Sequence, residues 1–282
     1  MKPIIRVALA AGAAMAALTP VLANHSWGNY HWASNGRELP LTINRAITSQ
    51  WTASVGTAIA DWEKSRKLAL TARNAGAINR KACEPILGEV LVCNDGWGRR
   101  GWLGIATIYI SGTHIIAGTT KLNDSYFDLP FYNTPAWRAL VACQEIAHDF
   151  GLDHQDETFG NFNLGTCMDY TNAPSGGIFN GFNYGPSNEH PNKHDYDQIA
   201  TIYSHDDGTA AAATNFGFRE VGKPAAPTTG LASSGVSPAE WGRAIRTDRE
   251  GRPNVFEKEL GPGKKMITHV FWAIGEGPGR SN

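Results

Sequence analysis

Long runs of charge of one sign are missing from this chain, and after the first residues so are long apolar segments. Lys and Arg number 25 against 26 Asp and Glu, which gives a formal net charge of -1 over 282 residues. Because there is no basic block, we expect no nucleic-acid binding through phosphate attraction. After the N-terminus, no apolar stretch approaches the ~20 residues that a membrane-spanning helix needs.

The exception is residues 1–23, which have the features of an export signal. Lys2 and Arg6 form a positive start, residues 7–18 are apolar, and small residues precede a cleavage position after Ala23. The alternative is a membrane anchor, but the apolar run is shorter than the ~20 residues required to span a bilayer. We therefore expect a secreted or periplasmic protein with no membrane contact once the signal is removed.

Cysteine is scarce, with four residues and no closely spaced CxxC pair, so a structural zinc site made of cysteines is not expected. After export, an even number of cysteines indicates disulfide bonds, and four cysteines allow three pairings. We favour Cys83 with Cys93, which closes a short loop, and Cys143 with Cys167. Free buried thiols are the alternative.

The patterns of apolar residues predict an α+β protein. Strands are expected at residues 39–47, 68–72, 88–93, 103–110 and 114–122, and helices at 48–66, from Thr134 to Gly151, and at 194–205. Residues 24–38 are predicted to form a surface-packed arm. Residues 207–237 are rich in Ala, Thr, Gly, Pro and Ser and are interpreted as a linker. Residues 238–282 would form a small C-terminal extension with β-structure, which leaves 24–206 as the main domain.

The stretch QEIAHDFGLDH, residues 144–154, carries the chemistry. On a helix, Gln144 and His148 project from the same face, with Glu145 on the adjacent flank. Gly151 can adopt a positive φ and end the helix, so that the chain returns His154 toward the same point. Two imidazoles, an amide and a carboxylate therefore converge, which is typical of a metal site with a base beside it.

This pattern resembles HExxHxxGxxH followed by a methionine turn, the signature of the metzincin zinc endopeptidases, which include matrixins and astacins. The matching residues are Glu145, His148, Gly151 and His154, and Met168 in CMDY resembles the methionine that lies beneath the metal. The resemblance covers about residues 39–205. It implies a twisted, mostly parallel sheet with an active-site helix, a methionine turn and a final helix.

The chain departs from the family at Gln144, where the pattern has histidine. Three readings stay open: Gln144 is a weak third ligand through its carbonyl oxygen, another histidine takes the position, or zinc and catalysis have been lost. The candidates for another histidine are His190, His194 and His114. Taken singly, six histidines are interpreted as surface or core residues: His25, His31, His114, His190, His194 and His205. Asp153, Asp156 and Glu157 are interpreted as a solvated loop, from which a carboxylate could orient a ligand imidazole.

The resemblance implies a zinc-dependent endopeptidase that acts on protein or peptide substrates. His148, His154 and Gln144 would bind Zn²⁺, and Glu145 would act as general base and then general acid. Strand 114–122 would offer an edge along which the substrate lies. A Cys143–Cys167 disulfide would clamp the helix to the methionine turn. The rival hypothesis is a non-catalytic binding or structural protein with a weak or absent zinc site.

Overall fold

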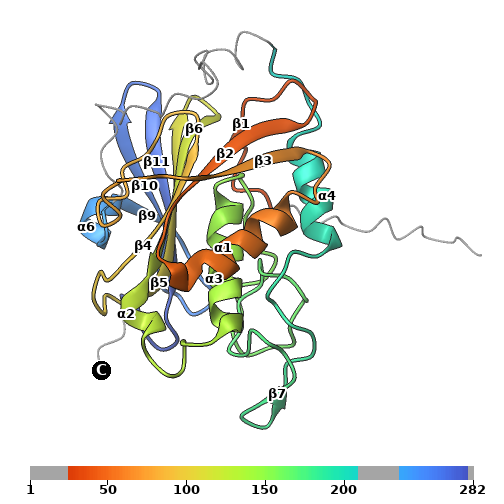
Figure 1. Cartoon of the computed structure of the whole chain (residues 1–282), viewed down its shortest axis with the longest axis vertical. Coiled ribbons are helices and arrows are strands. Elements are labelled where there is room, and N and C mark those ends of the chain that lie inside the picture. The colour runs from red at the N-terminus through yellow and green to blue at the C-terminus, as the bar shows by residue number, and fades with distance from the viewer. Residues whose placement is uncertain (1–24, 209–234, 279–282) are drawn as a thin grey trace, which may run out of the picture.

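The computed structural model describes residues 25–208 and 235–278 (Figure 1). The predicted export signal and most of the predicted linker lie outside these described residues. The fold is mixed α/β, with one large sheet and few helices, in keeping with the α+β prediction. In chain order the elements are β1 (His31–Trp32), β2 (Leu39–Ala46), α1 (Ser49–Trp62), β3 (Leu68–Asn74), β4 (Val90–Asp95), β5 (Trp102–Ser111), β6 (His114–Asn123), α2 (Asp124–Phe127), α3 (Pro135–His148), β7 (Ile178–Phe179), β8 (Phe182–Asn183), α4 (Lys193–Ile202), α6 (Pro238–Trp241), β9 (Arg243–Thr247), β10 (Pro253–Gly261) and β11 (Lys264–Trp272).

The large sheet has the strand order β3-β2-β4-β6-β5-β11-β10-β9, and β1 adds to the start of β6. Strands β3, β2, β4 and β6 pair in parallel, whereas every pairing from β6 through β5 to β9 is antiparallel. The expected mostly parallel sheet is therefore found only in the first half. The reason is that β5 pairs with β6 as an antiparallel neighbour, and the C-terminal extension then adds three more antiparallel strands to the same sheet.

The expected substrate edge at residues 114–122 is wrong. These residues form β6, which lies inside the sheet between β4 and β5. The outer edge of β5 is also occupied, because β11 pairs with it from Lys264 opposite Ser111 to Trp272 opposite Trp102. Among the described strands, β3 and β9 end the strand order and the two-residue β1 lies off it, so a peptide could extend this sheet only at one of these three.

Helices α1 and α3 pack against one face of the sheet, and α6 lies beside the C-terminal strands (Figure 1). Trp51 and Trp62 of α1 are fully buried in the core on the side of α3, which also contains Ile267 and Phe271 of β11. Burying a large apolar side chain contributes about 2 kcal/mol. The C-terminal extension therefore shares the main core with the rest of the described chain.

The N-terminal segment before β2 is not the surface-packed arm that was predicted, because Trp27 and Trp32 are buried. The indole Nε1–H of Trp32 donates to the carbonyl of Asp149 at 2.7 Å, just past the end of α3. The backbone N–H of Trp27 donates to the carbonyl of Gly151, also at 2.7 Å. The arm is therefore fastened to the turn on which the candidate site depends.

Candidate metal centre

Helix α3 begins and ends as its sequence predicts. The Thr134 hydroxyl accepts the N–H of Trp137, and Pro135 takes the first helical position. After His148 the chain turns at Gly151, whose φ is +86°. A Cβ at Gly151 would lie 2.2 Å from the carbonyl oxygen of Tyr30, so only glycine fits between the helix end and the arm.

The turn at Gly151 brings His154 against His148, and their Nε2 atoms are 3.1 Å apart. The Nδ1 of His148 lies 2.7 Å from the carbonyl oxygen of Leu152, and the Nδ1 of His154 lies 2.8 Å from Oε1 of Glu157. A carbonyl and a carboxylate only accept, so each Nδ1 carries the hydrogen and each neutral ring has a bare lone pair on Nε2.

A cation between two such lone pairs would satisfy both nitrogens. Burial and the neighbouring His154 hold the pKa of His148 well below its usual range, so this ring stays neutral and can bind a metal. A metal ion satisfies both nitrogens, and the Nδ1–H bonds to Leu152 and Glu157 are the outer contacts that ligand imidazoles normally make. The facing Nε2 atoms of His148 and His154 and the partners of their Nδ1 atoms therefore fit a bound metal ion.

A third imidazole belongs to this cluster, and it comes from the C-terminal extension. Ligand atoms of His148, His154 and His269 all lie within 4.8 Å of one another. His269 is buried on β11, where its Nε2 is 3.0 Å from the Tyr170 hydroxyl and its Nδ1 is 3.5 Å from Oε2 of Glu145. Burial and the two neighbouring imidazoles lower its pKa well below the usual range, so the ring stays neutral and able to bind metal.

His269 is not among the metal ligands expected from the sequence. The available signal was a histidine inside the apolar run of residues 266–274, in a strand whose neighbours are core residues. The three histidines considered as substitutes for the missing ligand lie elsewhere. His190 pairs with Asp61 at 2.6 Å, His194 stacks on His25 with ring centroids 4.9 Å apart, and His114 contacts Asp207.

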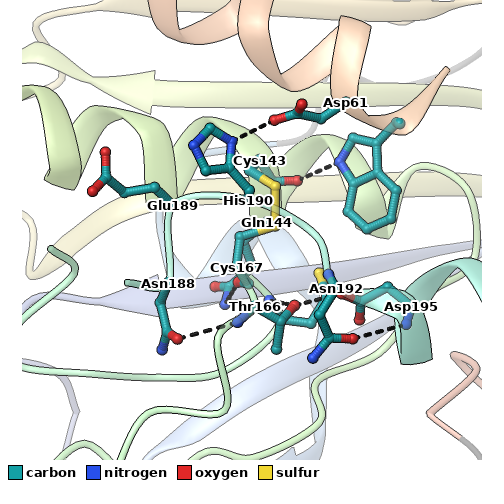
Figure 2. The surroundings of a disulfide bond; sticks show 12 residues. Asp61, Cys143, Gln144, Thr166, Cys167, Asn188, Glu189, His190, Asn192 and Asp195 are labelled. Atoms are coloured by element: carbon teal, nitrogen blue, oxygen red, sulfur yellow. Dashed lines mark hydrogen bonds and ion pairs between the residues drawn. A yellow bond between two sulfur atoms is a disulfide. The ribbon is translucent and has the colours of Figure 1, made fainter. Parts of the chain in front are cut away.

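Gln144 lies one turn before His148 and is fully buried. Its Nε2 donates to the carbonyl of Cys167 at 2.8 Å, which orients the amide (Figure 2). Its Oε1 is buried and has no hydrogen-bond partner within the part of the chain that the structure describes. A buried acceptor left without a donor costs about 1–3 kcal/mol, so this oxygen is available to a ligand.

Both expected disulfides are present, Cys83–Cys93 and Cys143–Cys167. Figure 2 shows the second one joining α3 to the segment that carries Met168, directly beside Gln144. The carbonyl of Cys143 also accepts the indole N–H of Trp62 at 3.1 Å. The disulfide, this hydrogen bond and the bond from Gln144 to the Cys167 carbonyl hold in place the turn of α3 that carries Gln144.

Met168 is fully buried, and its segment is tied to the chain just after His154. The N–H of Gln155 donates to the carbonyl of Met168 at 2.6 Å, and the N–H of Met168 donates to the Thr166 hydroxyl at 3.0 Å. The ring of Tyr170 lies against His154, with centroids 4.6 Å apart. The methionine segment is therefore one wall of the histidine cluster.

Glu145 is fully buried between α3 and β5. A Cβ at Gly104 would lie 2.7 Å from Cγ of Glu145, so the glycine in β5 makes room for this side chain. Burial raises the pKa of Glu145 well above its usual range, and Asp149 adds to the rise. The carboxyl group lies beside His269, close to the histidine cluster.

The acidic loop after the helix is not the solvated loop that was expected. The side chains of Asp153 and Glu157 are only about 15% exposed, and both pair with Arg246 of β9. Burial opposes the charge of Glu157, but its bond to His154 lowers the pKa of this carboxyl overall. The Nδ2 of Asn254 in β10 also donates to Glu157 at 3.0 Å. The C-terminal strands therefore help to orient His154 as well as contributing His269.

The cluster lies beneath the surface. His148, His269 and Glu145 are fully buried, and the buried ring of Trp27 covers His148 with centroids 5.2 Å apart. The arm and the C-terminal strands both separate the histidines from solvent.

No protein-family model matches this chain, and no curated protein matches it either. Within the described residues, no helix has the length and apolar character needed to cross a membrane. The two disulfides are in keeping with an oxidising compartment. The groups of His, Asp and Glu side chains described above could bind a metal ion.

Proposed function

We propose that this protein is a zinc-dependent endopeptidase of the metzincin type, exported to an oxidising compartment, with protein or peptide substrates. The observation that carries the proposal is the pair of Nε2 lone pairs that face each other across 3.1 Å in His148 and His154. Neutral imidazoles around a carboxylate-bearing helix favour zinc over magnesium or calcium, which prefer oxygen ligands.

His148, His154 and His269 would hold the ion, and the buried Oε1 of Gln144 is a further donor within the same helix face. This modifies the ligand set expected from sequence, because an imidazole from β11 takes the place of the missing histidine. Zinc bound here would supply a Lewis acid and would lower the pKa of a bound water toward ~7.

Glu145 is the proposed proton carrier. Its Oε2 lies 3.5 Å from Nδ1 of His269, so the carboxylate is next to the proposed ligands without being one of them. It would accept the proton of the attacking water on a carboxylate oxygen and then donate it to the nitrogen of the leaving amine. Its fixed position against Gly104 keeps it aimed at the cluster without a change of rotamer.

The burial of the cluster favours a second function, a non-catalytic protein in which the metal has a structural role. Strand β11 both supplies His269 and occupies the edge of β5, so a substrate could reach the histidines only after β11 or the arm has moved. Structural zinc sites have their positions filled by protein ligands, whereas a catalytic site keeps one open. The two functions therefore differ in whether the protein cleaves peptides, and both predict a bound metal.

The test uses the mature chain, residues 24–282, with both disulfides formed. We expect about one zinc ion at this centre, and cleavage of casein that Glu145→Gln abolishes while the metal stays bound. Glu63→Gln, an exposed glutamate at the end of α1, is the matched control and should cleave normally. Zinc with no cleavage by the wild type would reject the endopeptidase in favour of the structural protein.

The ligand set has its own test. Replacing His269 by Ala should lower zinc affinity by a factor of 10–100 or more, the range found when supporting or ligating groups are lost. Replacing Gln144 by Ala should have a smaller effect, because an amide oxygen is the weaker donor. The reverse order would assign the third position to Gln144, as the sequence alone suggested.

A further inference from the structure

A second group of imidazoles gathers where three segments distant in the sequence meet. His31 belongs to β1, His114 is the first residue of β6, and His205 and Asp207 follow α4. The parallel pairing of β1 with β6 sets His31 directly opposite His114. An isolated bridge between Asn35 and Asp206 draws the segment after α4 to the same point.

The three imidazoles surround one carboxylate oxygen. The Nε2 atoms of His31, His205 and His114 lie 3.4, 3.1 and 3.4 Å from Oδ1 of Asp207. The Nε2 atoms of His31 and His205 are 2.9 Å from each other. In a tetrahedral site with bonds of about 2.0–2.1 Å, neighbouring ligand atoms lie about 3.4 Å apart. The separations among the ligand atoms of His31, His205 and Asp207 are close to that geometry, whereas His114 does not belong to the set of atoms that all lie within 4.8 Å of one another.

The outer contacts of the group also suit metal binding. The Nδ1 of His31 lies 2.8 Å from the carbonyl oxygen of Asn29, so Nε2 is the ring nitrogen that faces Asp207 and would bind a metal ion. The other carboxylate oxygen of Asp207, Oδ2, accepts the backbone N–H of Ser34 at 2.8 Å. This bond orients the Asp207 carboxylate toward the imidazoles, and Oδ2 itself lies 3.2 Å from Nε2 of His31.

We propose that His31, His205 and Asp207 bind a divalent transition-metal ion such as Zn²⁺. Two nitrogen donors and one oxygen suit zinc and its neighbours in the periodic table better than magnesium or calcium. A pocket of about 320 Å³ lined by His31 and His205 opens beside the group, and the side chain of His205 is 46% exposed. An ion can therefore enter from solvent.

This site does not depend on the proposed peptidase function. It shares no residue with the centre formed by His148, His154 and His269, and an ion here would cross-link the N-terminal arm and the segment after α4. Without a metal, the same group would be a network of imidazole–carboxylate hydrogen bonds. The experiment has to separate these two states.

The mature chain is stripped with a chelator and titrated with Zn²⁺ in competition with a chromophoric indicator. We expect His205→Gln to bind one zinc ion fewer per chain than the wild type, and His31→Gln to do the same. The matched control is His190→Gln, a comparably exposed histidine that pairs with Asp61 away from this group, and it should bind as the wild type does. Far-UV circular dichroism of each stripped variant shows whether the fold is retained.

A second measurement uses the unchanged protein. Zn²⁺ should protect His205 from modification by diethylpyrocarbonate, read by mass spectrometry, while His190 stays reactive. Equal labelling of His205 with and without Zn²⁺ would overturn the proposal. An unchanged zinc stoichiometry and affinity in His205→Gln and His31→Gln would do so as well, leaving only the hydrogen-bonded network.

Discussion

Replacing Gly151 by Ala tests how the turn after α3 builds the metal centre. A non-glycine residue held at φ +86° costs about 1–2 kcal/mol. The new Cβ would lie 2.2 Å from the Tyr30 carbonyl oxygen, so the arm has to move and the hydrogen bond from Trp27 to residue 151 is lost, at about 1 kcal/mol. We expect the free energy of unfolding to fall by about 3 kcal/mol in total.

The measurement is urea denaturation of the mature chain with its disulfides intact. Gly160→Ala is the control, because Gly160 has no positive φ and its added Cβ would meet nothing within 4 Å. That control should change stability by no more than about 0.5 kcal/mol. A loss below about 1 kcal/mol in Gly151→Ala would refute the argument that the arm and the turn are locked together.

Two further predictions concern a buried lysine and the two disulfides. Lys121 is buried on β6, which lowers the pKa of its ammonium group to about 7, whereas the unfolded chain keeps the usual value near 10.5. Because the unfolded state binds more protons between these values, stability should rise from pH 7 to pH 9 by about 2 kcal/mol more in the wild type than in Lys121→Met. Equal slopes in the two proteins would show that this amine is not desolvated. Replacing Cys143 and Cys167 by Ala should cost about 3 kcal/mol and weaken zinc binding, since the bond closes a 24-residue separation beside Gln144. Replacing Cys83 and Cys93 should lower stability without changing zinc affinity, and a similar zinc loss in both pairs would argue against a local clamp.

Much of the centre could be predicted from the sequence because it is local. Thr134 and Pro135 mark the start of α3, Gly151 marks its end, and the spacing from His148 to His154 follows from that turn. The helix and strand positions before residue 206 were also recognisable from apolar periodicity, since each element buries one face. Their order in the chain is as expected.

The remainder depends on contacts that periodicity does not encode. The sequence of the strand that contains His269 does not indicate which strand it pairs with. The pairing of β11 with β5, which places His269 beside His148, could therefore not be predicted. The same pairing turned the predicted C-terminal extension into part of the main sheet. The choice is made by packing of Ile267 and Phe271 into the shared core, which is a property of the folded chain.

The group around Asp207 was missed for a related reason. His31, His114 and His205 lie far apart in the sequence, and each one alone is most simply a surface or core residue. Only the pairing of β1 with β6 and the bridge after α4 bring them to one carboxylate. A single histidine in a sequence can be recognised as a metal ligand only when the segments that lie next to it in the fold are known.

The proposal that His148, His154 and His269 form one metal centre can be tested by crystallography. Crystals of the mature protein are grown with Zn²⁺ and measured on both sides of the zinc absorption edge. We expect an anomalous peak within bonding distance, about 2.0–2.1 Å, of a ring nitrogen of each of the three residues. A zinc-replete crystal with no peak between His148 and His154, or with a peak that His269 does not reach, would contradict it.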